Sequence, residues 1–156
     1  MPVMTQAMPP EAAAERLYNL ARRYGTRKED NKRDQSGEGS DRCASGHETT
    51  IFSVKRGKLE LTAQDCSLWN CCGNYSTSGG NYAFSDVDYK IKGRTVFSAS
   101  RTNNGERYED HLVSGESKTE KIPASGWKVT ASDKTKKNLA QIIKELKQKL
   151  SRKRKH

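Results

Sequence analysis

Positively charged side chains gather at the C-terminal end of the chain, where they could neutralise phosphate groups. Residues 132–156 contain ten Lys and Arg against two acids, about +8 of the formal net charge of +10. Residues 1–49 are balanced, and residues 50–131 carry a small excess of about +2. Such a concentration creates a local field that attracts nucleic acid or an anionic membrane. A solvated tail without a partner is the alternative.

The cations that could bind phosphate fall into a main group and a secondary basic patch. A nucleic acid additionally offers bases that can stack on aromatic side chains, although tyrosines are more commonly half-buried in a sheet. The main group is Lys144, Lys147, Lys149, Arg152, Lys153, Arg154 and Lys155. The secondary patch is Lys55, Arg56 and Lys58, which Lys90, Lys92 and Arg94 could extend. The candidate stacking residues are Tyr75, Tyr82, Tyr89 and Tyr108.

Four cysteines and one histidine raise the question of a metal site or of disulfide bonds. Cys43 and His47, and likewise Cys66 and Cys71, have a local spacing that tetrahedral zinc accepts, but no Cys-x2-Cys pair is present. Pairing of these thiols and Cys72 in disulfides is disfavoured in a reducing compartment. The sequence leaves open whether the cysteines bind metal or pair, and we assign no metal ligand and no cofactor.

The run Glu109-Asp110-His111 contains the residue types of an acid–base site. On a strand, however, the acids next to His111 point to the opposite face of the sheet, so the three side chains would not converge. An ordinary polar strand is therefore favoured, and no catalytic residue is assigned. A small nuclease or toxin using His111 is the enzymatic alternative.

Two amphipathic helices are predicted at the two ends of the chain. An N-terminal helix within residues 1–25 presents one apolar face, which should pack on the folded domain: Ala13, Leu17, Leu20, Ala21 and Tyr24. A C-terminal helix, capped by Ser132-Asp133, carries an apolar stripe: Leu139, Ile142, Ile143, Leu146 and Leu150. Its lysines lie mostly off this stripe and should stay in solvent.

Between the helices, a polar segment is followed by short strands. Residues 26–49 have almost no large apolar side chain and are expected to be a flexible linker. Residues 50–150 are expected to form the folded domain, with residues 151–156 as a basic tail. Asn104-Gly105 predicts a two-residue hairpin turn. In that hairpin the opposing pairs would be Phe97 with Leu112, Val96 with Val113, and Ser98 with His111.

These elements predict an α+β fold, an antiparallel meander or partly closed barrel of five to seven strands capped by the C-terminal helix, with a separate N-terminal helix. The strand Gly57-Lys58-Leu59-Glu60-Leu61-Thr62, and the closing strand Trp127-Lys128-Val129-Thr130 leading into an amphipathic helix, resemble the PH-like superfold over about residues 50–150. The resemblance rests on element order and implies a protein-binding or headgroup-binding module. An open sheet of the kind that binds RNA is the alternative.

The expected function is non-catalytic binding of nucleic acid, RNA before DNA, through the basic C-terminal helix and tail. A PH-like module that binds a protein or a phosphoinositide is the alternative, and a protein partner or larger assembly is compatible with either. The chain has no apolar run of the roughly 18–20 residues that a membrane span requires. Without a recognisable secretory signal, the expected location is the cytoplasm or the nucleus.

Overall fold

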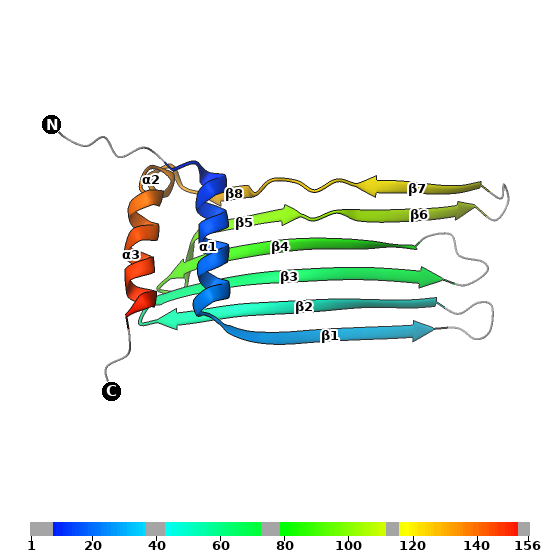
Figure 1. Ribbon diagram of the computed structural model, residues 1–156, viewed down its shortest axis with the longest axis horizontal. Helices are drawn as coiled ribbons and strands as arrows, with labels where there is room; N and C mark the ends of the chain where they lie inside the picture. The colour runs from blue at the N-terminus through cyan, green and yellow to red at the C-terminus, as the bar shows by residue number, and fades with distance from the viewer. Residues whose placement is uncertain (1–7, 37–42, 73–78, 112–115, 153–156) are drawn as a thin grey trace.

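The computed structural model describes residues 8–36, 43–72, 79–111 and 116–152. Within these ranges, the side chains are described except at residues 34–44, 70–80 and 107–118. In these ranges the chain forms three helices and eight strands (Figure 1). The helices are α1 (Pro10–Tyr24), α2 (Asp133–Lys137) and α3 (Leu139–Ser151). The strands are β1 (Thr26–Ser36), β2 (Cys43–Arg56), β3 (Leu59–Cys72), β4 (Gly79–Ile91), β5 (Arg94–Thr102), β6 (Gly105–His111), β7 (Glu116–Ile122) and β8 (Lys128–Ala131).

The strands form one antiparallel sheet in the order β1-β2-β3-β4-β5-β8. β6 pairs with the first residues of β4 and with β7, so β6 extends the line of β5, and β7 extends the line of β8. Among the described residues β1 pairs only with β2 and β8 only with β5, which leaves the sheet open. The α+β meander is therefore confirmed, whereas a partly closed barrel is not what the strands form.

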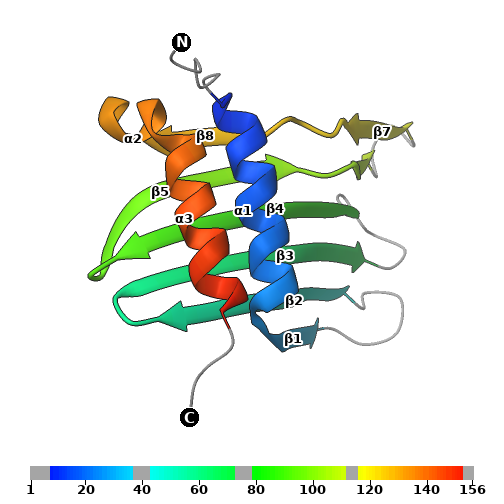
Figure 2. The same ribbon diagram turned by 60° about the vertical axis from the view of Figure 1, so that its left-hand side comes forward.

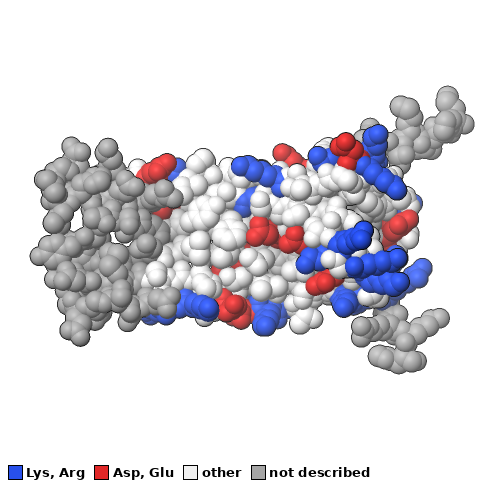
Figure 3. Space-filling view, turned by 180° about the vertical axis from the view of Figure 1, so that it is seen from behind, with Lys and Arg blue, Asp and Glu red and all other residues white. Residues whose placement is uncertain are grey.

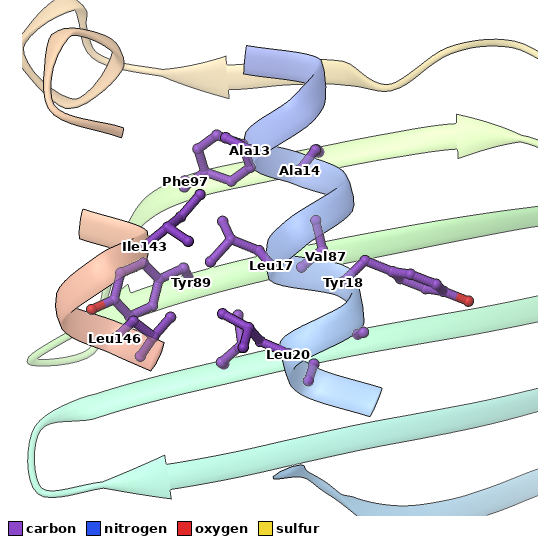
Figure 4. Close-up of a cluster of buried hydrophobic side chains, with 14 of the residues drawn as sticks. Ala13, Ala14, Leu17, Tyr18, Leu20, Val87, Tyr89, Phe97, Ile143 and Leu146 are labelled. Atoms are coloured by element: carbon purple, nitrogen blue, oxygen red, sulfur yellow. The ribbon is translucent and has the colours of Figure 1, made fainter. Parts of the chain in front are cut away.

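Both long helices cover the same face of the sheet, over the end where β2 turns into β3 and β4 into β5 (Figures 1 and 2). The apolar faces of α1 and α3 close over the inward-facing residues of β3, β4 and β5 (Figure 4). Phe97, Leu17, Leu61, Leu139 and Leu146 are among the largest fully buried side chains. Both predicted stripes, and the docking of the N-terminal helix on the sheet, are confirmed.

Residues 26–49 differ from the expected flexible linker. Residues 26–36 form β1 and residues 43–49 form the first half of β2, with a regular antiparallel register from Thr26 opposite Ser53 to Ser36 opposite Cys43. Residues 26–33 are exposed throughout, because β1 is an edge strand beyond the helix layer. A strand that buries neither face needs no apolar alternation, and backbone pairing to β2 is its main tie to the sheet.

The prediction of a hairpin at Asn104-Gly105 is wrong. Phe97 lies opposite Ala131 of β8, Ser98 lies opposite Thr130, and His111 lies opposite Glu116 of β7. Neither Asn104 nor Gly105 has a positive φ, which the two-residue turn would require. Instead the chain is interrupted between β5 and β6: Asn103 N–H donates to Ala83 O (2.7 Å), and Asn104 Oδ1 accepts from Ala124 N–H (3.1 Å).

The C-terminal helix begins as predicted and is then interrupted. The Ser132 hydroxyl accepts a hydrogen bond from Thr135 N–H (3.2 Å), which is the expected N-terminal cap. At Asn138 the helix breaks, and α3 begins with Leu139. Since α2 buries no residue and α3 buries four, α3 holds the C-terminal part of the chain on the sheet.

Candidate nucleic-acid interface

Helix α3 presents its lysines to solvent because its other side is buried. Leu139, Ile143, Leu146 and Leu150 repeat at three- and four-residue intervals and pack into the core. The three candidate phosphate-binding lysines of this helix fall between them and are exposed: Lys144, Lys147 and Lys149. Arg152, which follows the helix, is exposed as well, while Lys153, Arg154 and Lys155 lie outside the described residues.

Two basic turns meet at the end of the sheet beneath α3. The β2–β3 turn contains Lys58 beside Gly57 (φ 58°), and the β4–β5 turn contains Lys92 (φ 53°) and Gly93 (φ 77°). Lys92 N–H donates to the Lys58 carbonyl oxygen at 2.9 Å, so the backbones of the two turns are joined directly. The secondary basic patch and its predicted extension therefore form one surface, although they lie in separate hairpins.

The same register arranges charges on the sheet face that the helices leave open. Lys55 lies opposite Glu60, and Glu60 lies opposite Lys90, so one acid stands between two bases on neighbouring strands. Directly opposed residues of antiparallel strands share a face, and unlike charges there attract weakly. Glu60 therefore offsets part of the positive charge without removing the excess.

These groups together make up what we term the basic end. α3 crosses this end of the sheet in both ribbon views (Figures 1 and 2), and Lys and Arg gather at the corresponding end of the opposite face (Figure 3). Only Glu60 and Glu145 oppose these cations within the two turns and α3. The basic end consists of Lys55, Arg56, Lys58, Lys90, Lys92, Arg94, Lys144, Lys147, Lys149 and Arg152.

Of the four tyrosines predicted for base stacking, the two with described side chains, Tyr82 and Tyr89, are not exposed. Tyr89 is 4% exposed, and its pKa is raised by burial and by the negative charge of Glu145 on α3. Tyr82 is half-buried and stacks near Phe84, with ring centroids 5.8 Å apart. The side chains of Tyr75 and Tyr108 are outside the described set. Neither Tyr82 nor Tyr89 therefore offers the basic end an exposed ring.

Cys43, Cys71 and Cys72 lie at the other end of their strands from the basic turns, and Cys66 lies midway along β3. The β2–β3 register sets Cys43 opposite Cys72, and their side chains are not among those described. Cys66 is a buried free thiol that accepts from the Thr49 hydroxyl at 3.5 Å. Within the described residues no group of three or more His, Cys, Asp and Glu could hold a metal ion.

A polar network where α1 meets the sheet was not anticipated from the sequence. Asp65 on β3 accepts hydrogen bonds from the hydroxyls of Tyr18 (2.5 Å) and Ser85 (2.7 Å). Burial, followed by the contact with Asp65, raises the pKa of Tyr18. Nearby, Glu15 accepts from Trp127 Nε1 (2.7 Å) and from the Arg101 guanidinium (3.0 Å).

This network fastens α1 to the sheet. Arg101 lies over the rings of both Tyr18 and Trp127, 5.0 and 4.6 Å from their centroids, and thereby fills the space between helix and sheet. The residues of the network come from five segments: α1, β3, β4, β5 and the segment just before β8. The sequence contained one signal of this network. Asp65 is polar, although it occupies the next position in the alternating pattern that Leu61 and Ala63 begin.

No protein family, curated protein sequence or solved structure matches this chain. Among the described residues, no helix combines the length and apolar character needed to cross a bilayer.

Proposed function

We propose that this protein binds nucleic acid through the phosphate backbone, and that the basic end is the contact surface. One observation carries the proposal: the hydrogen bond between Lys92 N–H and the Lys58 carbonyl joins two basic turns beside the lysine-bearing helix α3. The cations of the two turns thereby lie side by side, and the lysines of α3 lie at the same end of the sheet, so a polyanion can contact several of them at once. RNA is the first ligand to test.

Backbone contacts of this kind have a measurable signature. Each neutralised phosphate releases condensed counterions, so the logarithm of affinity falls linearly with the logarithm of salt concentration. Contacts to phosphate carry no sequence information directly, so affinity should depend little on sequence. Fluorescence anisotropy with single-stranded RNA, duplex RNA and duplex DNA over a salt series measures both quantities.

The two joined turns give the sharpest test. The double substitution Lys58→Gln/Lys92→Gln should weaken binding and reduce the salt slope by about one for each phosphate that is no longer neutralised. The matched control is Lys121→Gln/Lys128→Gln, which removes the same charge from exposed positions on β7 and β8. An equal decrease in affinity in both variants would indicate a general charge effect and would contradict the assignment to the basic end.

The tail is tested by neutralising Arg152, Lys153, Arg154 and Lys155 together, or by ending the chain at Leu150. Leu150 is the last buried residue of α3, so the shortened chain should keep its unfolding free energy within about 0.5 kcal/mol. Binding to every nucleic acid should weaken to a similar extent. Unchanged affinity after either alteration would remove the tail from the proposal.

A second candidate is an interaction module of PH-like character that binds an anionic headgroup. A pocket beside the β2–β3 turn favours it, since Lys55 and Arg56 are among its lining residues together with Tyr24, Thr26, Ser53, Val54 and Glu60. The antiparallel sheet with flanking helices is compatible with such a fold. Saturable binding that persists at high salt and survives removal of the tail would favour this candidate over nucleic acid.

A further inference from the structure

The outer edge of β1 is unpaired among the described residues and strongly charged. β1 stands at one end of the strand order, with β2 as its single described neighbour. Its side chains from Thr26 to Arg33 are all exposed. Along the lower edge of Figure 3, where β1 lies, basic and acidic side chains alternate. The backbone N–H and C=O groups on such an edge can pair with another strand.

The charges of β1 are complementary to themselves in one antiparallel register. In the order Arg27, Lys28, Glu29, Asp30, Asn31, Lys32, Arg33, two acids precede Asn31 and two bases follow it. If a second β1 pairs with Asn31 opposite Asn31, then Glu29 lies opposite Arg33, and Asp30 lies opposite Lys32. Each unlike pair occurs twice, because the two strands are related by a two-fold axis.

Neighbouring registers lack this complementarity. When the two-fold axis is perpendicular to the sheet, two opposed residues must share a face of the sheet. The sum of the numbers of two opposed residues can therefore change only in steps of two from one register to the next. One step in one direction sets Arg27 opposite Arg33 and Lys28 opposite Lys32. One step in the other sets Lys32 opposite itself. Like charges directly opposed destabilise a strand pair, so a single register is selected.

Two of the charged side chains in the proposed ion pairs, Arg33 and Glu29, have contacts within the chain. On the helix-bearing face, the Arg33 guanidinium lies 5.8 Å from the centroid of the Trp69 ring, which passes over Gly46 on the intervening strand. Arg27 and Glu29 form an exposed ion pair at 2.6 Å. Pairing in the proposed register would replace these two contacts with ion pairs between Arg33 of one copy and Glu29 of the other.

We propose that β1 pairs antiparallel with β1 of a second copy of this chain, about a two-fold axis through Asn31. Charged residues on an edge strand ordinarily prevent pairing. Here their order favours one partner, another copy in one register, and disfavours others. The joined sheet would have its helix layers on the same side and the two basic ends pointing in opposite directions, because the paired strands run antiparallel.

A charge-swap experiment tests the proposal with the full chain. Variant one is Glu29→Lys/Asp30→Lys, and variant two is Lys32→Glu/Arg33→Glu. Each alone sets like charges opposite one another in the proposed register, so its dimer dissociation constant should rise about tenfold or more. An equimolar mixture restores every unlike pair and should form a one-to-one heterodimer. Analytical ultracentrifugation of each variant and of the mixture measures this, and circular dichroism verifies the fold.

A second measurement reports on the axis directly. In the proposed register, Asn31→Cys places the new thiols of the two copies opposite each other. Mild oxidation should then cross-link the two copies to a greater extent than the native cysteines alone do. Arg27→Cys, on the same face of the same strand, does not face itself and serves as the control. A wild-type chain that is monomeric throughout, a mixture without heterodimer, or equal cross-linking at both positions would each overturn the proposal.

Discussion

At the scale of single residues, Asp65 links helix α1 to the sheet. It accepts from the hydroxyls of Tyr18 on α1 and Ser85 on β4, so one carboxylate satisfies donors from two other elements. Asp65→Ala leaves both part-buried hydroxyls without this acceptor and should lower the unfolding free energy by about 1–3 kcal/mol. Urea unfolding measures the decrease. Ser67→Ala, exposed on the same strand face, is the control, and an equal decrease there would contradict the role of Asp65.

Asp86 on β4 offers a prediction of pH dependence. Burial, and then the like charge of Asp88, raise the pKa of Asp86 above its ordinary value. A raised folded-state pKa means that the native state binds the proton more tightly, so stability declines as pH rises through the ordinary carboxyl range toward that pKa.

Asp86→Asn should therefore stabilise the protein at pH 7 and bring no gain below about pH 3. Since Asp86 is only half-buried and solvent screens its charge, we expect a gain of about 0.5 kcal/mol or less. Thermal unfolding at both pH values measures it, with the exposed Glu120→Gln as a control. A gain that is the same at pH 3 would refute the electrostatic cause.

At the scale of elements, the connection from α1 to β1 depends on a close backbone approach at Gly25. A Cβ there would lie 2.4 Å from Ala21 O and 2.9 Å from Ser53 N, and neither backbone atom can move freely. The φ of Gly25 is an ordinary −81°, so the constraint is one of space.

Gly25→Ala should lower the unfolding free energy by about 1–3 kcal/mol, because α1 must shift relative to β2. At Gly126 the nearest atom to a Cβ is a Glu11 carboxylate oxygen at 3.6 Å, an ordinary contact. Gly126→Ala is therefore the matched control, and chemical denaturation compares the two. Equal stability of both variants would show that the close approach at Gly25 relaxes without cost.

At the scale of the whole molecule, one end of the sheet is covered by helices and the strands extend well beyond them (Figure 1). The covered end holds the apolar core and, on its surface, the basic end. The edge formed by β1 is a separate surface, so the two proposals can be tested independently. The heterodimer of the charge-swap variants has the same net charge as the wild-type dimer. Its affinity for nucleic acid should consequently match that of the wild type.

Much of the core could be predicted from local pattern, and long-range pairing could not. The stripes of α1 and α3 follow from apolar spacing, because a helix buries residues close in sequence. The partner of β5 does not follow from its own residues: Asn104-Gly105 suggested β6, whereas β5 pairs with β8. A polar edge strand such as β1 carries no apolar period at all, so local pattern cannot detect it.

The amino-acid sequence by itself determined which segments bury an apolar face and where positive charge accumulates along the chain. Only the tertiary structure decided that Lys58 and Lys92 are neighbours, that Asp65 joins three elements, and that β1 is an exposed edge. The physical reason is that helix spacing and net charge are local properties. Strand register is set by competition among pairings between distant segments, and its outcome depends on the whole sheet.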